Sequence, residues 1–155
     1  MGCGKSVVGA LVAQRAGAPF HDLDLRIESE AGMSISDLFA IHGKAAFRTL
    51  ESRLLPTVLD PGAVVAIGGG APLDDENWRL ITERSVTVFI DCGLDTIWQR
   101  TSGTTNRPLA VGRSREELEA LLRVRLPRYR EAVHRVNGDR PPDIVASEVL
   151  EIWSD

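Results

Sequence analysis

The sequence predicts an α/β fold in which helices cover both faces of a central parallel sheet. Segments with helical and strand-like patterns alternate along the 155 residues. The continuous apolar run 63–67 and the mostly apolar segment 86–90 are typical of buried strands. A chain of this length can bury one core, so we expect a single domain, residues 1–155, built as three layers of helices, sheet and helices.

The first half of the chain begins with a predicted helix. Apolar residues follow Ser6 in a run long enough for a buried helix, which Gly17 and Pro19 end. The other elements expected here are a short strand at 19–24, helices at 37–41 and 43–55, and a strand at 63–67 that three glycines close.

The second half continues the alternation. Asp74 is placed to cap a helix that extends through Ile81. Ser114 and Glu117 form a capping box for a helix to about residue 126. The other elements expected here are a strand at 86–90, a helix at 95–101, a loop at 102–113, a helical stretch from Pro127 to Val133, and a terminal helix at 144–153.

Composition limits the classes of partner. A formal charge of -4 argues against nonspecific nucleic-acid binding, which depends on a basic surface. No apolar run is long enough to span a bilayer, so we expect no membrane partner. The two cysteines, Cys3 and Cys92, are too few for a disulfide framework and lack metal-ligand spacing. We therefore expect a cytoplasmic protein with reduced thiols.

The segment Gly2-Cys3-Gly4-Lys5-Ser6 carries the end of the phosphate-loop pattern G-x-x-x-x-G-K-[ST]. Glycines let successive backbone N–H groups converge on phosphate oxygens, and the helix that follows adds its positive N-terminus. Lys5 would add a charge for the outer phosphates and Ser6 a hydroxyl for Mg²⁺. A glycine-rich tail is the alternative interpretation, but the apolar helix after Ser6 favours the phosphate loop.

Two aspartates follow the predicted strand at 19–24. Asp22 and Asp24 are two residues apart, which places both side chains on one face of an extended segment. Such a pair can serve a metal and a substrate hydroxyl, although solvated acids at a strand end remain an equal alternative.

Gly68, Gly69 and Gly70 follow a buried strand, where any Cβ would block close approach to the backbone. A bare turn is the alternative, but three consecutive glycines favour a substrate that contacts main-chain N–H groups. Arg48 and Glu51 lie three residues apart on one helix, so they can pair while Arg48 reaches a ligand; a surface ion pair explains the spacing equally well.

Arginines in the second half are further candidates. Arg107, in the loop of about 102–114, is a candidate lid residue for a transferred phosphate. Arg125, Arg128 and Arg130 cluster around Pro127, and one of them can clamp a carboxylate while the others are solvated.

Taken in order, these segments resemble shikimate kinases over nearly the whole chain. The matching motifs are Gly2–Ser6, Asp22-x-Asp24, Phe47-Arg48-x-x-Glu51, Gly68-Gly69-Gly70, Asn106-Arg107-Pro108-Leu109 and Arg125-x-Pro-x-Tyr129. The resemblance implies ATP-dependent phosphorylation of the 3-hydroxyl of shikimate, on the route to chorismate and the aromatic amino acids. It also implies the P-loop fold of nucleoside monophosphate kinases, Mg²⁺ as cofactor, and a monomer with ATP and shikimate as ligands.

The resemblance assigns roles residue by residue. It implies ATP contacts from Gly2, Cys3, Gly4, Lys5, Ser6, Val7, Arg100, Arg107 and Arg140. It implies shikimate contacts from Asp24, Arg48, Gly68, Gly69, Gly70 and Arg125, with Arg48 and Arg125 on the carboxylate. Ser6 and Asp22 are the implied metal ligands, Asp22 through water, and Lys5, Asp24 and Arg107 the implied catalytic residues.

The chain also departs from the family pattern. The central first strand of the family's sheet and the first glycine of its loop are missing from this sequence, so we expect lower stability and activity than with that strand present. Ala66 and Val7 replace common hydroxyl residues, which is tolerable. The alternative functions are a related small-molecule kinase, such as a gluconate kinase, and a nucleotide-binding module without catalysis.

Overall fold

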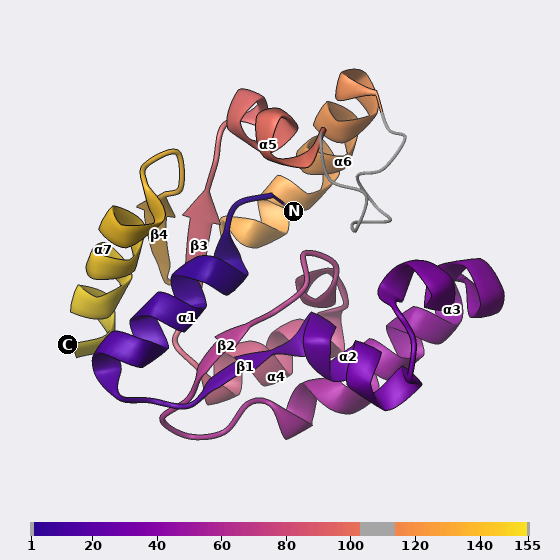
Figure 1. Ribbon diagram of the computed structural model, residues 1–155, viewed down its shortest axis with the longest axis horizontal. Coiled ribbons are helices and arrows are strands. Elements are labelled where there is room, and N and C mark those ends of the chain that lie inside the picture. The colour runs from indigo at the N-terminus through magenta and orange to yellow at the C-terminus, as the bar shows by residue number, and fades with distance from the viewer. Residues whose placement is uncertain (1, 103–113, 155) are drawn as a thin grey trace.

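Helices and strands alternate along the chain, as predicted (Figure 1). The computed structural model describes residues 2–102 and 114–154. Its elements are α1 (Lys5–Ala16), β1 (Phe20–Asp22), α2 (Leu23–Ala31), α3 (Ile35–Leu54), η1 (Leu55–Thr57), β2 (Val64–Ala66), η2 (Ala71–Leu73), α4 (Asp75–Arg84), β3 (Val88–Asp91), α5 (Leu94–Thr101), α6 (Arg115–Tyr129), β4 (His134–Asn137) and α7 (Pro142–Ser154).

The strands form two short parallel sheets. β1 pairs with β2, with Phe20 opposite Val64, and β3 pairs with β4, with Val88 opposite His134. Within the described part of the chain, no ladder of hydrogen bonds joins β2 to β3. Each strand therefore has a single partner, and the parallel layer is made of two pairs.

Helices cover both faces of this layer. On one face, a core cluster joins α2, α3, η1 and α4, with Val65 of β2 packed against it. On the other face, α1 and α7 form a second cluster that contacts Val64 of β2, Val88 and Ile90 of β3, and Val136 of β4. Figure 1 shows α1 and α7 side by side along this face. Both sheets are thus covered on one face by α1 and α7. With the helices on the other face, they form the three predicted layers.

The first correction concerns the segment 19–24. β1 ends at Asp22, whose carboxylate caps α2 by accepting hydrogen bonds from the backbone N–H groups of Asp24, at 3.0 Å, and Leu25, at 3.4 Å. Asp24 therefore lies in the first turn of a helix, and the prediction that both aspartates share one face of a strand is wrong. The capping bonds stabilise a helix start at this point.

The two helices predicted at 37–41 and 43–55 form one element, α3, which begins earlier than expected. Ser34 caps it by accepting from the N–H of Asp37 at 3.1 Å. Gly43 has φ 82° and ψ 170°, which interrupts the helical conformation where the prediction placed a break. Glycine tolerates this positive φ without the steric cost that a Cβ adds.

The prediction for the segment after the capping box is partly wrong. The box itself is confirmed, because the N–H of Glu117 donates to Ser114 Oγ and the N–H of Ser114 donates back to Glu117 Oε2. However, α6 continues without a break through Pro127 and ends at Tyr129, so the helical stretch expected as far as Val133 stops earlier than predicted. The strand β4 follows there and was not predicted.

Burial of the strands is also lower than predicted. Val64, Val65 and all of β3 are only half-buried, although their apolar runs predict full burial. One edge of β2 and one of β3 carry no neighbouring strand among the described residues, which explains the exposure. No helix among the residues described is long and apolar enough to cross a membrane.

Candidate active site

The loop Gly2–Ser6 leads directly into the N-terminus of α1. Gly2 and Gly4 have φ of 64° and 83°, so the backbone turns through left-handed conformations on both sides of Cys3. Gly4 is the N-cap of α1, and no side chain caps this end. The free N–H groups and the helix dipole make this terminus suited to an anion.

Each polar side chain at the start of α1 contacts one of the aspartates from the β1–α2 junction. The hydroxyl of Ser6 donates to Asp22 Oδ2 at 2.5 Å. The ammonium of Lys5 donates to Asp24 Oδ2 at 3.3 Å, with both side chains partly exposed. The structure thus brings both aspartates to the phosphate loop, although not through the strand geometry that the sequence suggested.

Arg48 and Glu51 form the predicted ion pair on α3. The pair is not on the surface, because the side chain of Glu51 is only 1% exposed. An added Cβ at Gly70 would collide with the guanidinium of Arg48, and one at Gly68 would lie 2.9 Å from Asp24 Oδ1 and 3.1 Å from Glu51 Oε1. The turn formed by Gly68, Gly69 and Gly70, called the glycine turn below, therefore packs closely against Arg48, Glu51 and Asp24.

Burial raises the pKa of Glu51, and the guanidinium of Arg48 opposes this rise. Glu51 Oε1 has no hydrogen-bond partner within the described ranges. A buried carboxylate oxygen without a donor is costly, so this atom is suited to receive a hydroxyl or N–H from a ligand.

The helix α6 also contributes residues to the site. Arg125 is 5% exposed and its Nε has no hydrogen-bond partner among the residues described. Its charge acts on both Glu51 and Tyr129, although burial still raises the pKa of Tyr129. The Tyr129 hydroxyl donates to the carbonyl of Gly69, which fixes the middle of the glycine turn. Arg48 from α3 thus lies against the turn, and Arg125 from α6 lies close enough to Glu51 and Tyr129 for its charge to act on both.

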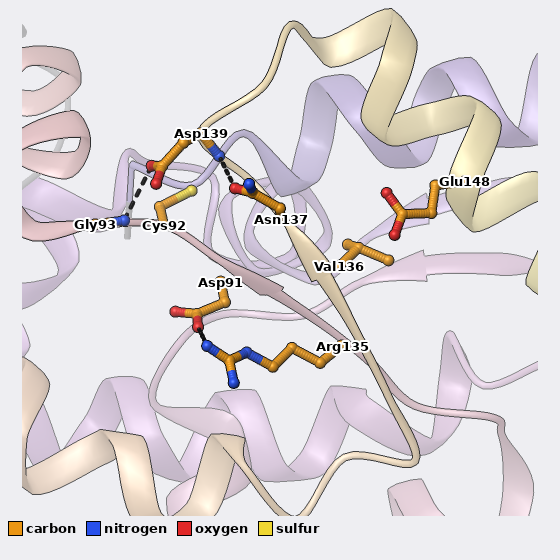
Figure 2. A pocket seen from close by; sticks show the side chains of 8 residues that line it. All are labelled: Asp91, Cys92, Gly93, Arg135, Val136, Asn137, Asp139 and Glu148. Carbon is orange, nitrogen blue, oxygen red and sulfur yellow. Dashed lines mark hydrogen bonds and ion pairs between the residues drawn. The ribbon is translucent and has the colours of Figure 1, made fainter.

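A hollow of about 580 Å³ lies at the carboxyl ends of β3 and β4 (Figure 2). Its lining residues are Asp91, Cys92, Gly93, Arg135, Val136, Asn137, Asp139 and Glu148. Most of its polar groups pair internally: Arg135 with Asp91, and Asp139 with the N–H of Gly93 at 2.9 Å. It adjoins the loop, because Cys92 Sγ lies 3.7 Å from the carbonyl oxygen of Cys3.

The family model described as "SKI: Shikimate kinase" matches residues 1–153. The chain belongs to the shikimate kinase family. It is 39% identical to a shikimate kinase of Rhizobium meliloti (strain 1021), with 100% of this chain and 82% of that relative aligned. It is 40% identical to one of Salinibacter ruber, over 98% of this chain and 80% of the relative.

Solved shikimate kinases have the same fold. The enzyme of Acinetobacter baumannii, in complex with shikimate, superposes with a TM-score of 0.93 and 32% identity, covering 99% of this chain and 88% of that one. The enzyme of Aquifex aeolicus superposes with a TM-score of 0.84, also at 32% identity, covering 99% of this chain and 91% of that one. This chain therefore has the three-layer P-loop kinase fold of the shikimate kinase family.

Several residues expected from the shikimate kinase resemblance lie apart from the glycine turn. Arg100 is near the loop, donating to the carbonyl of Gly138 at 3.2 Å and to Cys92 Sγ at 3.7 Å. Arg140 pairs with Glu148 on α7. Arg107 and most of the lid at 102–114 lie outside the described residues.

Of the arginine cluster around Pro127, only Arg125 lies in the site. Arg128 pairs with Asp75 and Glu131 and lies over the ring of Trp78, and Arg130 is exposed. Glu51 and Tyr129 were not among the predicted site residues, although both occur in the motifs. The sequence contained a signal for both, since Glu51 lies three residues after Arg48 and Tyr129 four residues after Arg125.

Proposed function

We propose that this chain transfers the γ-phosphoryl group of ATP to the 3-hydroxyl of shikimate, forming shikimate 3-phosphate and ADP. Membership of the shikimate kinase family supports this reaction. The observation that carries the proposal is the contact of Lys5 Nζ with Asp24 Oδ2 at 3.3 Å. It links the phosphate loop to Asp24, whose Oδ1 faces Gly68 next to Glu51, and so supports a donor site for ATP beside an acceptor site for shikimate.

ATP binds through its phosphates to the loop before α1. The backbone N–H groups of Gly2, Cys3, Gly4, Lys5, Ser6 and Val7 form the cradle. Lys5 neutralises the β- and γ-phosphates, and the N-terminus of α1 adds its dipole. Arg100 and Arg140 lie near the adenine, and Arg107 stabilises charge on the transferred group.

Ser6 and Asp22 would hold Mg²⁺, Asp22 through water. Their oxygens form a hydrogen bond of 2.5 Å, so a hydroxyl and a carboxylate already face each other beside the loop. Such a pair fits Mg²⁺, which prefers oxygen ligands and usually takes one or two from protein and the rest from phosphates and water. The ion supplies charge neutralisation of the phosphates when bound.

Shikimate binds against the glycine turn. Arg48 and Arg125 bind its carboxylate, since guanidinium groups match carboxylates in geometry and charge. The missing partner of Arg125 Nε supports this assignment. The backbone of Gly68, Gly69 and Gly70 contacts the ring, and Asp24 accepts from its hydroxyls. The unpartnered Oε1 of Glu51 offers a further acceptor.

Asp24 serves as the base in the transfer. Its Oδ2 is bound to Lys5 while its Oδ1 faces Gly68, so one carboxylate spans the donor and acceptor sides. It orients the 3-hydroxyl and takes its proton as the oxygen attacks phosphorus. Lys5 and Arg107 balance the charge on the phosphoryl oxygens. Most of the acceleration in such reactions comes from positioning and charge neutralisation.

A coupled assay of ADP release tests this function, with shikimate and then gluconate as acceptors. We expect release with shikimate alone. Asp24→Asn should lower kcat by about 10²- to 10⁴-fold, the range for loss of a general base, whereas the exposed Glu83→Gln control should match the wild type. No release with either acceptor, alongside measurable ATP binding, would instead identify a nucleotide-binding module, and release with gluconate alone a different kinase.

We also propose that the protein acts as a monomer in the cytoplasm. The shikimate kinase resemblance supports the monomer, and the two free thiols fit a reducing compartment. Light scattering at working concentrations tests the monomer, and a dimer mass that persists on dilution would refute it.

A further inference from the structure

The two cysteines of the chain lie next to each other, although 89 positions separate them in sequence. Cys3 is in the middle of the phosphate loop, and Cys92 follows the last residue of β3. The sulfur of Cys92 lies 3.7 Å from the carbonyl oxygen of Cys3, and both thiols are free and half-buried. Cys92 also lines the open hollow at the ends of β3 and β4, as Figure 2 shows.

We propose that Cys3 and Cys92 form a reversible disulfide under peroxide, and that this bond switches off nucleotide binding. The bond is inferred from the approach of the Cys92 sulfur to the backbone of Cys3. Its consequence rests on the proposed role of the loop Gly2–Ser6 in holding phosphate.

The loop can move toward β3 more easily than β3 can move toward the loop. Cys3 has a glycine on each side, and both glycines adopt positive φ. Glycine crosses between backbone regions at little steric cost, so the loop can pivot at Cys3. By contrast, Cys92 is held by its neighbours: a Cβ added at Gly138 would overlap its sulfur, and Arg100 donates to it at 3.7 Å.

The chemistry balances with hydrogen peroxide or an organic peroxide as oxidant. One thiolate attacks the peroxide, forming a sulfenic acid and releasing water or an alcohol. The second sulfur attacks the sulfenic sulfur, the S–S bond forms and the S–O bond breaks, and water leaves. Burial raises the pKa of the Cys92 thiol to about 11, which makes its thiolate scarce at neutral pH, so Cys92 is not assigned the first attack on the peroxide.

The bond alters the loop because sulfur atoms in a disulfide lie about 2.0 Å apart. Cys3 must then shift toward the end of β3, and its N–H, with those of its neighbours, leaves the phosphate-binding arrangement. The contacts of Arg48, Glu51 and Tyr129 with the glycine turn lie on other elements and stay in place. Oxidation should therefore affect the two substrates differently: the affinity for nucleotide falls and the affinity for shikimate does not.

The test combines a mass measurement with binding. Purified protein is treated with hydrogen peroxide and the excess is removed. We expect an intact mass lower by two hydrogen atoms, a peptide map that links Cys3 to Cys92, and recovery of both thiols with dithiothreitol. Calorimetry should show a loss of at least about tenfold in affinity for Mg²⁺-ATP, an unchanged affinity for shikimate, and recovery on reduction.

Cys92→Ala is the control variant, since Cys92 has no proposed contact with either substrate. It should bind ATP and turn over like the wild type when reduced, and form no intramolecular link. Two titratable thiols after peroxide treatment, or only intermolecular links, would overturn the proposed bond. A linked protein with undiminished ATP affinity would overturn its regulatory effect. Reduced protein that binds no ATP would refute the proposed function instead, and the mass measurement would still report the bond.

Discussion

The guanidinium of Arg48 occupies the space that a side chain at Gly70 would need. The backbone of Gly70 has φ -96° and ψ -24°, a conformation that every residue adopts, so glycine is not required there for its conformational freedom. It is required because a helix on one side of the site brings an arginine against the turn on the other.

Gly70→Ala should therefore impair substrate binding more than folding. The new methyl group displaces the end of a flexible side chain, so we expect a small loss of stability, within about 1 kcal/mol. Arg48 moves out of position, and the KM for shikimate should rise by about tenfold or more, equivalent to about 1.4 kcal/mol, while the KM for ATP stays constant. Steady-state kinetics measures both. Gly93→Ala is a control, since a Cβ there would make only an ordinary contact; equal KM values for the two variants would contradict the prediction.

Tyr129→Phe should loosen the glycine turn. The substitution keeps the ring, whose centroid lies 5.5 Å from that of Phe89, and removes the hydroxyl that donates to the carbonyl of Gly69. Loss of one such bond costs about 0.5–1.5 kcal/mol of folding free energy, measurable by urea unfolding. The KM for shikimate should rise as well. An increase confined to the KM for ATP would show that Tyr129 does not position the acceptor side.

Stability should depend on pH through Glu51. Its pKa is raised above the ordinary value of 4.5, mainly by burial, so the folded protein holds more protons than the unfolded protein between the two values. The free energy of unfolding of the wild type, relative to Glu51→Gln, should therefore fall as pH rises from 4.5 through the folded-state pKa. The slope cannot exceed about 1.4 kcal/mol per pH unit for one proton.

Urea unfolding of both proteins at a series of pH values measures this difference. Glu83→Gln, on the exposed face of α4, is the matched control and should stay parallel to the wild type throughout. A difference between wild type and Glu51→Gln that does not change with pH would show that Glu51 keeps its ordinary pKa.

Ser114→Ala should destabilise α6 by about 1 kcal/mol, because it removes one half of a capping box. The N–H of Glu117 loses its acceptor, and the helix that carries Arg125 and Tyr129 frays from its start. Thermal unfolding measures the loss. Ser154→Ala, near the end of α7, should leave the midpoint nearly unchanged, and an equal effect of the two substitutions would argue against capping as the cause.

Local patterns predicted the parts of the site that one element determines. The spacing of Arg48 and Glu51 on α3 and the capping box at Ser114 were read from the sequence and are confirmed. The burial of Glu51 was not predictable in this way, since it depends on the glycine turn packed against it.

Parts that depend on competing local interactions were missed. The helix α2 escaped prediction although Leu23 and Ile27, four residues apart, are fully buried, because the two aspartates beside them were read as a strand end. β4 is four residues long and alternates only weakly, so its identity comes from pairing with β3 rather than from its own composition. The approach of Cys92 to Cys3 is likewise a result of topology, which no short pattern encodes.

The shared cover of the two strand pairs has a consequence for how the molecule opens. Two-stranded sheets have little stability alone. The helix α1 packs against both strand pairs, so it connects the β1–β2 pair to the β3–β4 pair. In native-state hydrogen exchange we expect two groups of amides with distinct opening energies, one from β1 and β2 and one from β3 and β4. A nucleotide bound at the start of α1 should slow exchange in both groups together, because it stabilises the helix that packs against both pairs.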